Sequence, residues 1–151
     1  MALWDQLKSR LTDLQATTTT QVGKFKSKDF AKASMAMCAL IAAADGTITA
    51  EERRKTAGFI GSNEALKVFE VSELQDHFTF YASKLEKDFD FGKVEAIATI
   101  GKLKNKPDAA RAVIQVGIII GGADGNFDAD EKRAVREACN AVGIPPAEFD
   151  L

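Results

Sequence analysis

The sequence predicts an all-α protein, a single compact domain of about seven helices with an internal pseudo-repeat of helix–acidic loop–helix units. The repeat is the first observation: residues 44–54 read ADGTITAEERR, residues 123–133 read ADGNFDADEKR, and six of the eleven positions are identical. The second is that apolar residues recur at helical spacing, with no strand-like alternation. We expect one domain over residues 1–151, with repeat units at about 28–62 and 107–141.

An amphipathic helix is predicted near the N-terminus, where apolar residues recur at helical spacing. They are Leu3, Trp4, Leu7, Leu11 and Leu14. We expect this helix to dock on the core, and the alternative is a surface for a membrane or a partner protein. The lysines that follow are expected to form a solvated face, with an acidic partner or anionic lipid as the alternative. They are Lys24, Lys26, Lys28 and Lys32.

The first half of the chain then predicts three helices. Residues 29–44 are apolar on all sides, which is typical of a central buried helix. Residues 49–60 are amphipathic, and Gly61-Ser62-Asn63 should end that helix. Ser72 and Gln75 have the spacing of a capping box that opens a helix through Lys87. The apolar face of that helix is predicted to be Leu74, Phe78, Tyr81 and Leu85.

Three further helices are predicted in the second half. Residues 88–103 should form a helix with four apolar residues facing inward, namely Val94, Ile97, Ile100 and Leu103. A second long apolar helix should start with Pro107 at its first position. Gly117, Gly121 and Gly122 in that helix would allow another helix to approach closely. A last helix is expected over residues 128–142, before a short C-terminal turn.

Both acidic loops carry the signals of one helix ending and another beginning. Gly46 and Gly125 follow the apolar runs, where glycine often ends a helix. A hydroxyl or carboxylate residue then precedes a glutamate by three positions, which is the spacing of a capping box. These pairs are Thr49 with Glu52 and Asp128 with Glu131.

The same loops match half of a calcium-binding EF-hand loop. Gly125, Phe127 and Glu131 occupy the positions of the EF-hand glycine, apolar residue and bidentate glutamate. The first and third positions would be Ile120 and Gly122, which offer no side-chain oxygen. Neither loop is therefore a complete calcium site by itself, and capping alone explains the same spacing. The candidate ligands for Ca²⁺ or Mg²⁺ are Asp45, Glu52, Asp124, Asp128 and Glu131.

Composition argues against several classes of protein. A net charge of −2 gives no general affinity for nucleic acid. No apolar run reaches the roughly 18 residues of a membrane span, and the N-terminus lacks the core of a signal peptide. Cys38 and Cys139 lie in helical runs without the spacing of a zinc site, so we expect both to be reduced. No nucleophile–base pair or phosphate-binding loop appears, and we expect a monomeric protein that is not an enzyme.

The acidic loops and three further stretches closely resemble the tellurite resistance protein TerB family. The further stretches are residues 21–26, 66–69 and 146–149. The resemblance implies a bacterial helical domain from a tellurium-oxyanion and stress resistance system, located in the cytoplasm or at the periphery of the inner membrane. It also implies partners among other tellurite-resistance proteins, some of them membrane-associated or calcium-binding. The metal site regarded as typical of the family maps here onto Asp45, Glu52, Asp124 and Glu131.

Two functions remain open at this point. The chain is expected to bind a divalent cation and partner proteins through its two Asp-Gly loops. The alternative is a metal-free adaptor for membrane-associated stress-response partners. Thr49 stands where the second loop has Asp128, so the two loops need not bind equally.

Overall fold

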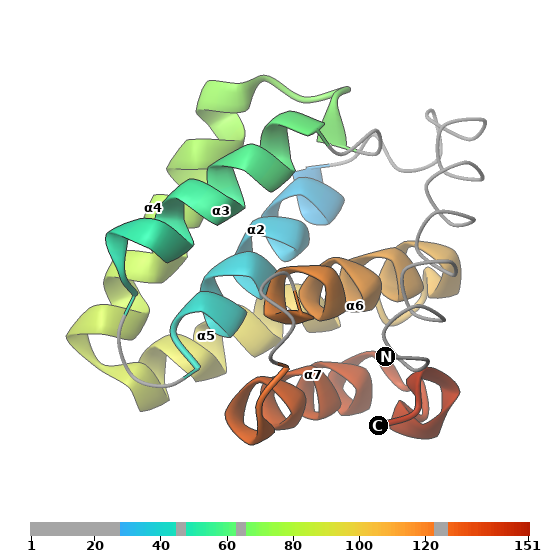
Figure 1. Cartoon of the computed structure of the whole chain (residues 1–151). Coiled ribbons are helices and arrows are strands. Elements are labelled where there is room, and N and C mark those ends of the chain that lie inside the picture. The colour runs from blue at the N-terminus through green and yellow to red at the C-terminus, as the bar shows by residue number, and fades with distance from the viewer. Residues whose placement is uncertain (1–27, 45–47, 63–65, 123–126) are drawn as a thin grey trace.

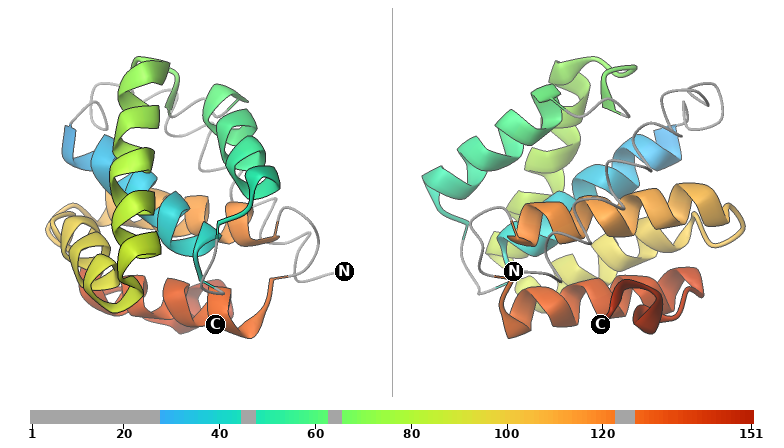
Figure 2. Two further views of the ribbon diagram at one scale, coloured as in Figure 1. Left: turned by 90° about the vertical axis from the view of Figure 1, so that its left-hand side faces the viewer. Right: turned by 45° about the vertical axis from the view of Figure 1, so that its right-hand side comes forward.

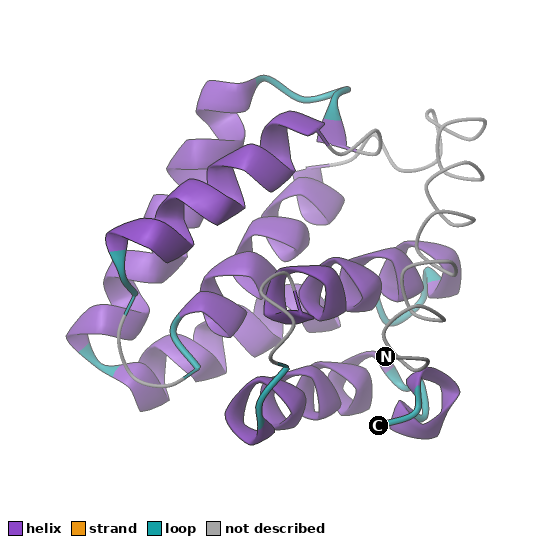
Figure 3. Cartoon of the chain, viewed as in Figure 1, coloured by secondary structure: helices purple, strands orange, loops and turns teal. Residues whose placement is uncertain are grey.

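The computed structural model describes residues 28–44, 48–62, 66–122 and 127–151. Within these residues the chain is helical without strands, as predicted, and forms one compact domain (Figure 3). The predicted N-terminal helix lies outside the described residues. The described elements are α2 (Lys28–Ala42), α3 (Ala50–Ser62), α4 (Val71–Lys87), α5 (Phe89–Gly101), α6 (Pro107–Gly122), α7 (Ala129–Val142) and the 3₁₀ helix η2 (Pro146–Phe149).

Helix α2 is the centre of the domain, as its apolar sequence predicts. It packs against α4, α5 and α6 and also contacts α3 and α7 (Figure 1). From Phe30 to Ala42 every residue except Lys32 is buried. At the start of α2, the ring of Phe30 stacks on that of Phe69 with centroids 6.4 Å apart. A helix enclosed on all sides needs apolar residues all round, which explains its composition.

Helices α4 and α5 form an antiparallel hairpin with Asp88 between them. A Cβ atom added at Gly92 would lie 2.7 Å from the backbone nitrogen of Leu85, so only glycine permits this close approach. Further along, the hydroxyls of Tyr81 and Thr99 share a buried 2.8 Å hydrogen bond. The predicted apolar face of α4 is buried, as expected.

Two sequence expectations in this hairpin are wrong. Val94 does not face inward: its side chain is 66% exposed, because α5 meets its neighbours through Gly92, Ala96, Thr99 and Ile100. The capping box at Ser72 is absent, because α4 already begins at Val71 and its N-cap, Glu70, makes no side-chain cap hydrogen bond. The stacking of Phe69 on α2 fixes the chain immediately before this start.

The C-terminal elements end as the sequence predicts. Gly143 adopts φ 74°, a left-handed conformation that favours glycine, and terminates α7. The η2 turn is tied to α6 by Arg111, whose Nε donates to Glu148 Oε2 at 2.9 Å. Among the described residues, no helix has the length and apolar character needed to cross a bilayer.

Candidate functional site

Helices α2 and α6, which precede the two acidic loops, run parallel and end together. A Cβ atom added at Gly117 would lie 2.6 Å from Met37 Sδ. One turn further along both helices, a Cβ atom at Gly121 would lie 3.5 Å from Ile41 Cγ2. The contacts therefore follow the same order along both helices, and the last turns of α2 and α6 meet (Figure 1). Gly117 permits the close approach of α2, as the sequence predicts, whereas the close neighbour of Gly121 is the ring of Phe127, 2.9 Å from an added Cβ atom. Both acidic loops therefore start from one end of the bundle.

Asp128 and Glu131 form the predicted capping box at the start of α7. Asp128 Oδ1 accepts a 2.8 Å hydrogen bond from the Glu131 N–H, and Glu131 Oε1 accepts a 2.9 Å bond from the Asp128 N–H. Each carboxylate thus commits one oxygen to the helix start. Since an ionised carboxylate has several acceptor positions, a role as metal ligand would use the remaining ones.

The other three predicted ligands are not placed by the structure. Asp45 and Asp124 lie outside the described residues, as does the side chain of Glu52, whose backbone belongs to α3. Among the described side chains, no three histidine, cysteine, aspartate or glutamate residues gather into a metal-binding group. The cation site and the structural equivalence of the two loops therefore remain predictions.

The helix ends give this region a distinctive electrostatic character. The carbonyl groups at the end of a helix carry partial negative charge. In α2 and α6, as far as the structure describes them, the last turn contains no basic side chain that would offset it. The N-terminus of α7 carries the opposite partial charge, and its first turn holds Asp130 and Glu131. Helix-end carbonyls and the carboxylates of the first turn of α7 thus lie at the same end of the domain.

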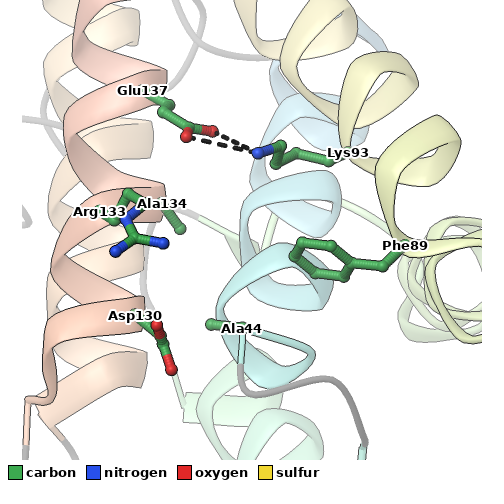
Figure 4. Close-up of a pocket in the computed structure, with 7 residues that line it drawn as sticks. All are labelled: Ala44, Phe89, Lys93, Asp130, Arg133, Ala134 and Glu137. Atoms are coloured by element: carbon green, nitrogen blue, oxygen red, sulfur yellow. Dashed lines mark hydrogen bonds and ion pairs between the residues drawn. The ribbon is translucent and has the colours of Figure 1, made fainter.

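A small cavity lies between the end of α2 and the start of α7 (Figure 4). Its volume is about 60 Å³, enough for only a few water molecules. Ala44, the residue before Asp45, and Asp130 of α7 are both in its wall. An ion pair between Lys93 Nζ and Glu137 Oε2, 3.3 Å apart, crosses it. The remaining wall is formed by Phe89, Arg133 and Ala134.

The cavity adds residues that the sequence did not single out. Lys93 belongs to α5 and Glu137 to α7, so their proximity depends on how these helices pack. Asp130 could have been found from the sequence, because it lies within the second repeat beside two predicted ligands. Its exposed position in the first turn of α7 makes it a further acidic group near the end of α2.

Both cysteines are free and buried, as expected. Burial raises the pKa of the Cys38 thiol in α2 to about 12. Burial also raises the pKa of Cys139 in α7 to about 11, with a smaller contribution from the charge of Glu148. A thiol reacts as its thiolate, so both side chains are protonated and poorly nucleophilic near neutral pH.

Comparison with known proteins identifies the family. The family described as "Tellurite resistance protein TerB" matches residues 31–151. The chain belongs to the TerB family. A curated relative, "Tellurium resistance protein TerB" from Alcaligenes sp, is 37% identical over 118 residues, which cover 78% of this chain and 97% of the relative. No solved structure gives a significant match.

The TerB match covers nearly the whole described fold. It begins within α2 and includes the sequences of both acidic loops, the residues that line the cavity and the C-terminal turn. The resemblance seen in the loop sequences is therefore confirmed. The amphipathic stretch of residues 1–14 precedes the matched TerB region.

Proposed function

We propose that this TerB protein binds a hard divalent cation, Ca²⁺ or Mg²⁺, where α2 and α6 end. We further propose that the occupied surface docks a partner protein of the tellurite-resistance system. The observation that carries the proposal is the parallel contact of α2 and α6 at Ile41 and Gly121, which starts both acidic loops from one place. The proposed ligands are Asp45, Glu52, Asp124, Asp128 and Glu131.

The chemistry of this region favours a hard cation. Ca²⁺ and Mg²⁺ prefer carboxylate and carbonyl oxygens, both of which the two loops and helix ends supply. No basic side chain in the described last turns of α2 and α6 competes with the ion. Because the two helix ends are in contact, one site shared by both loops is favoured over two separate sites.

The alternative proposal is a metal-free adaptor for membrane-associated stress-response partners. It is supported by Asp128 and Glu131, whose capping hydrogen bonds explain their spacing without a metal. The Lys93–Glu137 pair likewise neutralises charge beside the cavity. In either form we propose a protein that works in the cytoplasm or at the inner-membrane surface without catalysing a reaction. The protonated, buried thiols support the absence of redox catalysis.

Calorimetric titration of the metal-free protein with Ca²⁺, Mg²⁺ and Zn²⁺ tests the cation site. We expect saturable binding of Ca²⁺ or Mg²⁺, and a shared site predicts one equivalent. Asp124→Asn should weaken binding by about tenfold or more, because it removes one ligand charge. Asp76→Asn, an exposed position on α4, is the matched control and should leave affinity unchanged.

The titration also separates the alternatives. If Asp45→Asn weakens the same single equivalent as Asp124→Asn, the two loops share one ion. Two independent equivalents, each lost with one variant, would contradict sharing. No binding of any of the three ions would contradict the cation site and leave the metal-free adaptor. Stability of metal-free Asp124→Asn should hold or rise, because one carboxylate is removed from an acidic cluster.

A further inference from the structure

Helix α5 carries apolar residues on the side that faces solvent. Its buried side packs against α2, α4 and α7, whereas Phe91 is 77% and Val94 66% exposed. Ala98, one turn beyond Val94, is also exposed. Figure 2 shows α5 at the outside of the bundle between α4 and α7, so no described element covers this side. The helix also carries Asp90, Lys93 and Glu95, but large apolar side chains left exposed together on one side of a helix indicate an interaction surface.

A groove lies beside this exposed face. Its volume is about 460 Å³, within the range that holds bulky apolar groups. Its walls are formed by Lys93, Val94, Ile97 and Ala98 of α5 with Glu137 and Asn140 of α7. Phe91 therefore projects from the same helix that forms one wall of an apolar groove. A protruding group and a hollow on one face are the requirements for self-complementary association.

We propose that the protein forms a two-fold homodimer in which the α5 helices of two copies pack antiparallel through this face. Phe91, Val94, Ala98 and Gly101 follow the three-and-four spacing of a helix–helix seam. Along the seam the side chains shrink steadily from phenylalanine to glycine. An antiparallel copy places the large end of one seam against the small end of the other. In this register Phe91 of each copy faces Gly101 of its partner and Val94 faces Ala98, so every layer pairs a larger residue with a smaller one.

Charge along α5 specifies the same orientation. Asp88 and Asp90 are exposed at its start, and Lys102 and Lys104 are exposed just beyond its end. None of these four makes an ion pair within the described part of the chain; the Asp88 side chain accepts only from the Phe91 N–H, at 3.3 Å. Antiparallel copies bring each acidic end to a basic end twice, whereas parallel copies would place like charges together. The shape of the exposed face of α5 and the charges at the two ends of the helix therefore both favour a second copy of this chain as the partner on that face.

The dimer is expected to be reversible and does not depend on the proposed cation site. One helix pair buries less than the roughly 800 Å² per partner of a standard interface, so dissociation is expected on the order of micromolar concentrations. From the sequence alone we expect a monomer, and the apolar pattern also places Val94 inside. The exposed face of α5 is visible only in the folded domain.

Sedimentation of the full chain from low micromolar to millimolar concentration tests the dimer. We expect a monomer–dimer equilibrium that Val94→Glu weakens by about tenfold or more, because association would desolvate an unpaired carboxylate. The variant should melt like the wild type, since position 94 is exposed in the monomer. Val71→Glu, at a 51% exposed valine of α4 away from this face, is the matched control and should not affect association.

Charge exchange tests the orientation. Asp90→Lys and Lys104→Glu should each weaken the dimer, and the double variant should restore it. A wild-type chain that stays monomeric at every concentration would overturn the proposal, as would a dimer insensitive to Val94→Glu. If only a chain lacking residues 1–14 dimerises through Val94, the N-terminal segment occupies this face in the full protein. That result would also overturn the second copy as the occupant.

Discussion

Cys38 provides a quantitative test of the burial of α2. Its side chain is inaccessible to solvent, and burial raises the pKa of the thiol from 9.0 to about 12. The unfolded chain exposes this thiol and loses its proton near pH 9, whereas the folded protein retains it. Stability falls with pH wherever the folded state binds more protons. The contribution of the neutral thiol is therefore complete below pH 9 and is lost progressively between pH 9.0 and about 12.

The magnitude follows from the size of the pKa shift. At pH 11, two pH units above the unfolded value of 9.0, the protonated thiol should have lowered the free energy of unfolding by about 3 kcal/mol, since each unit is worth about 1.4 kcal/mol. A Cys38→Ala variant lacks this pH dependence, but its free energy of unfolding is lower at every pH because the substitution leaves a cavity. The wild type should therefore be the more stable protein at about pH 8, and its advantage should shrink by about 3 kcal/mol at about pH 11.

Urea unfolding followed by circular dichroism at these two pH values measures the difference. Groups other than Cys38 that titrate in this range are common to both proteins, so comparing the two isolates the thiol. A stability difference that stays constant from pH 8 to 11 would refute the reasoning. It would mean that the thiol ionises equally in the folded and unfolded chains, and hence that α2 is not enclosed as described.

Three other predictions concern the fold and the loop. Ile118→Asp should abolish the cooperative melting transition, because it buries an unpaired carboxylate where the side chain is 1% exposed; a normal melt would contradict this. In metal-free protein, Asp128→Ala should lower the free energy of unfolding by about 1 kcal/mol in denaturant titrations, since α7 loses its N-cap acceptor. Gly92→Ala should lower Tm through its 2.7 Å approach to the Leu85 backbone, whereas Gly58→Ala, with nothing within 4 Å, should not; equal effects on Tm would refute the close-approach argument.

Local features of the fold were predictable from the sequence because their causes are local. The capping box between Asp128 and Glu131 needs only residues three positions apart, and it forms as predicted. Gly143 likewise ends α7 through its own backbone conformation. The long apolar runs of α2 and α6 identified the central helices, since such sequences are stable only when enclosed.

The same local signals failed where packing decided the outcome. Ser72 has the spacing of a capping box, yet α4 starts earlier, after Phe69 is fixed against Phe30. Ile118 and Ile119 are neighbours in the apolar run of α6, but only Ile118 is fully buried. Periodicity shows that a helix has an apolar side without showing how many neighbours will cover it.

The sequence by itself determined the helical class, the two acidic loops and the family to which they point, because these depend on composition and short spacings. Only the tertiary structure decided that α2 and α6 run parallel and end together at Ile41 and Gly121. It alone placed Phe91 and Val94 in solvent. These properties arise from contacts between residues far apart in the chain, and such contacts leave no signal in the local sequence pattern.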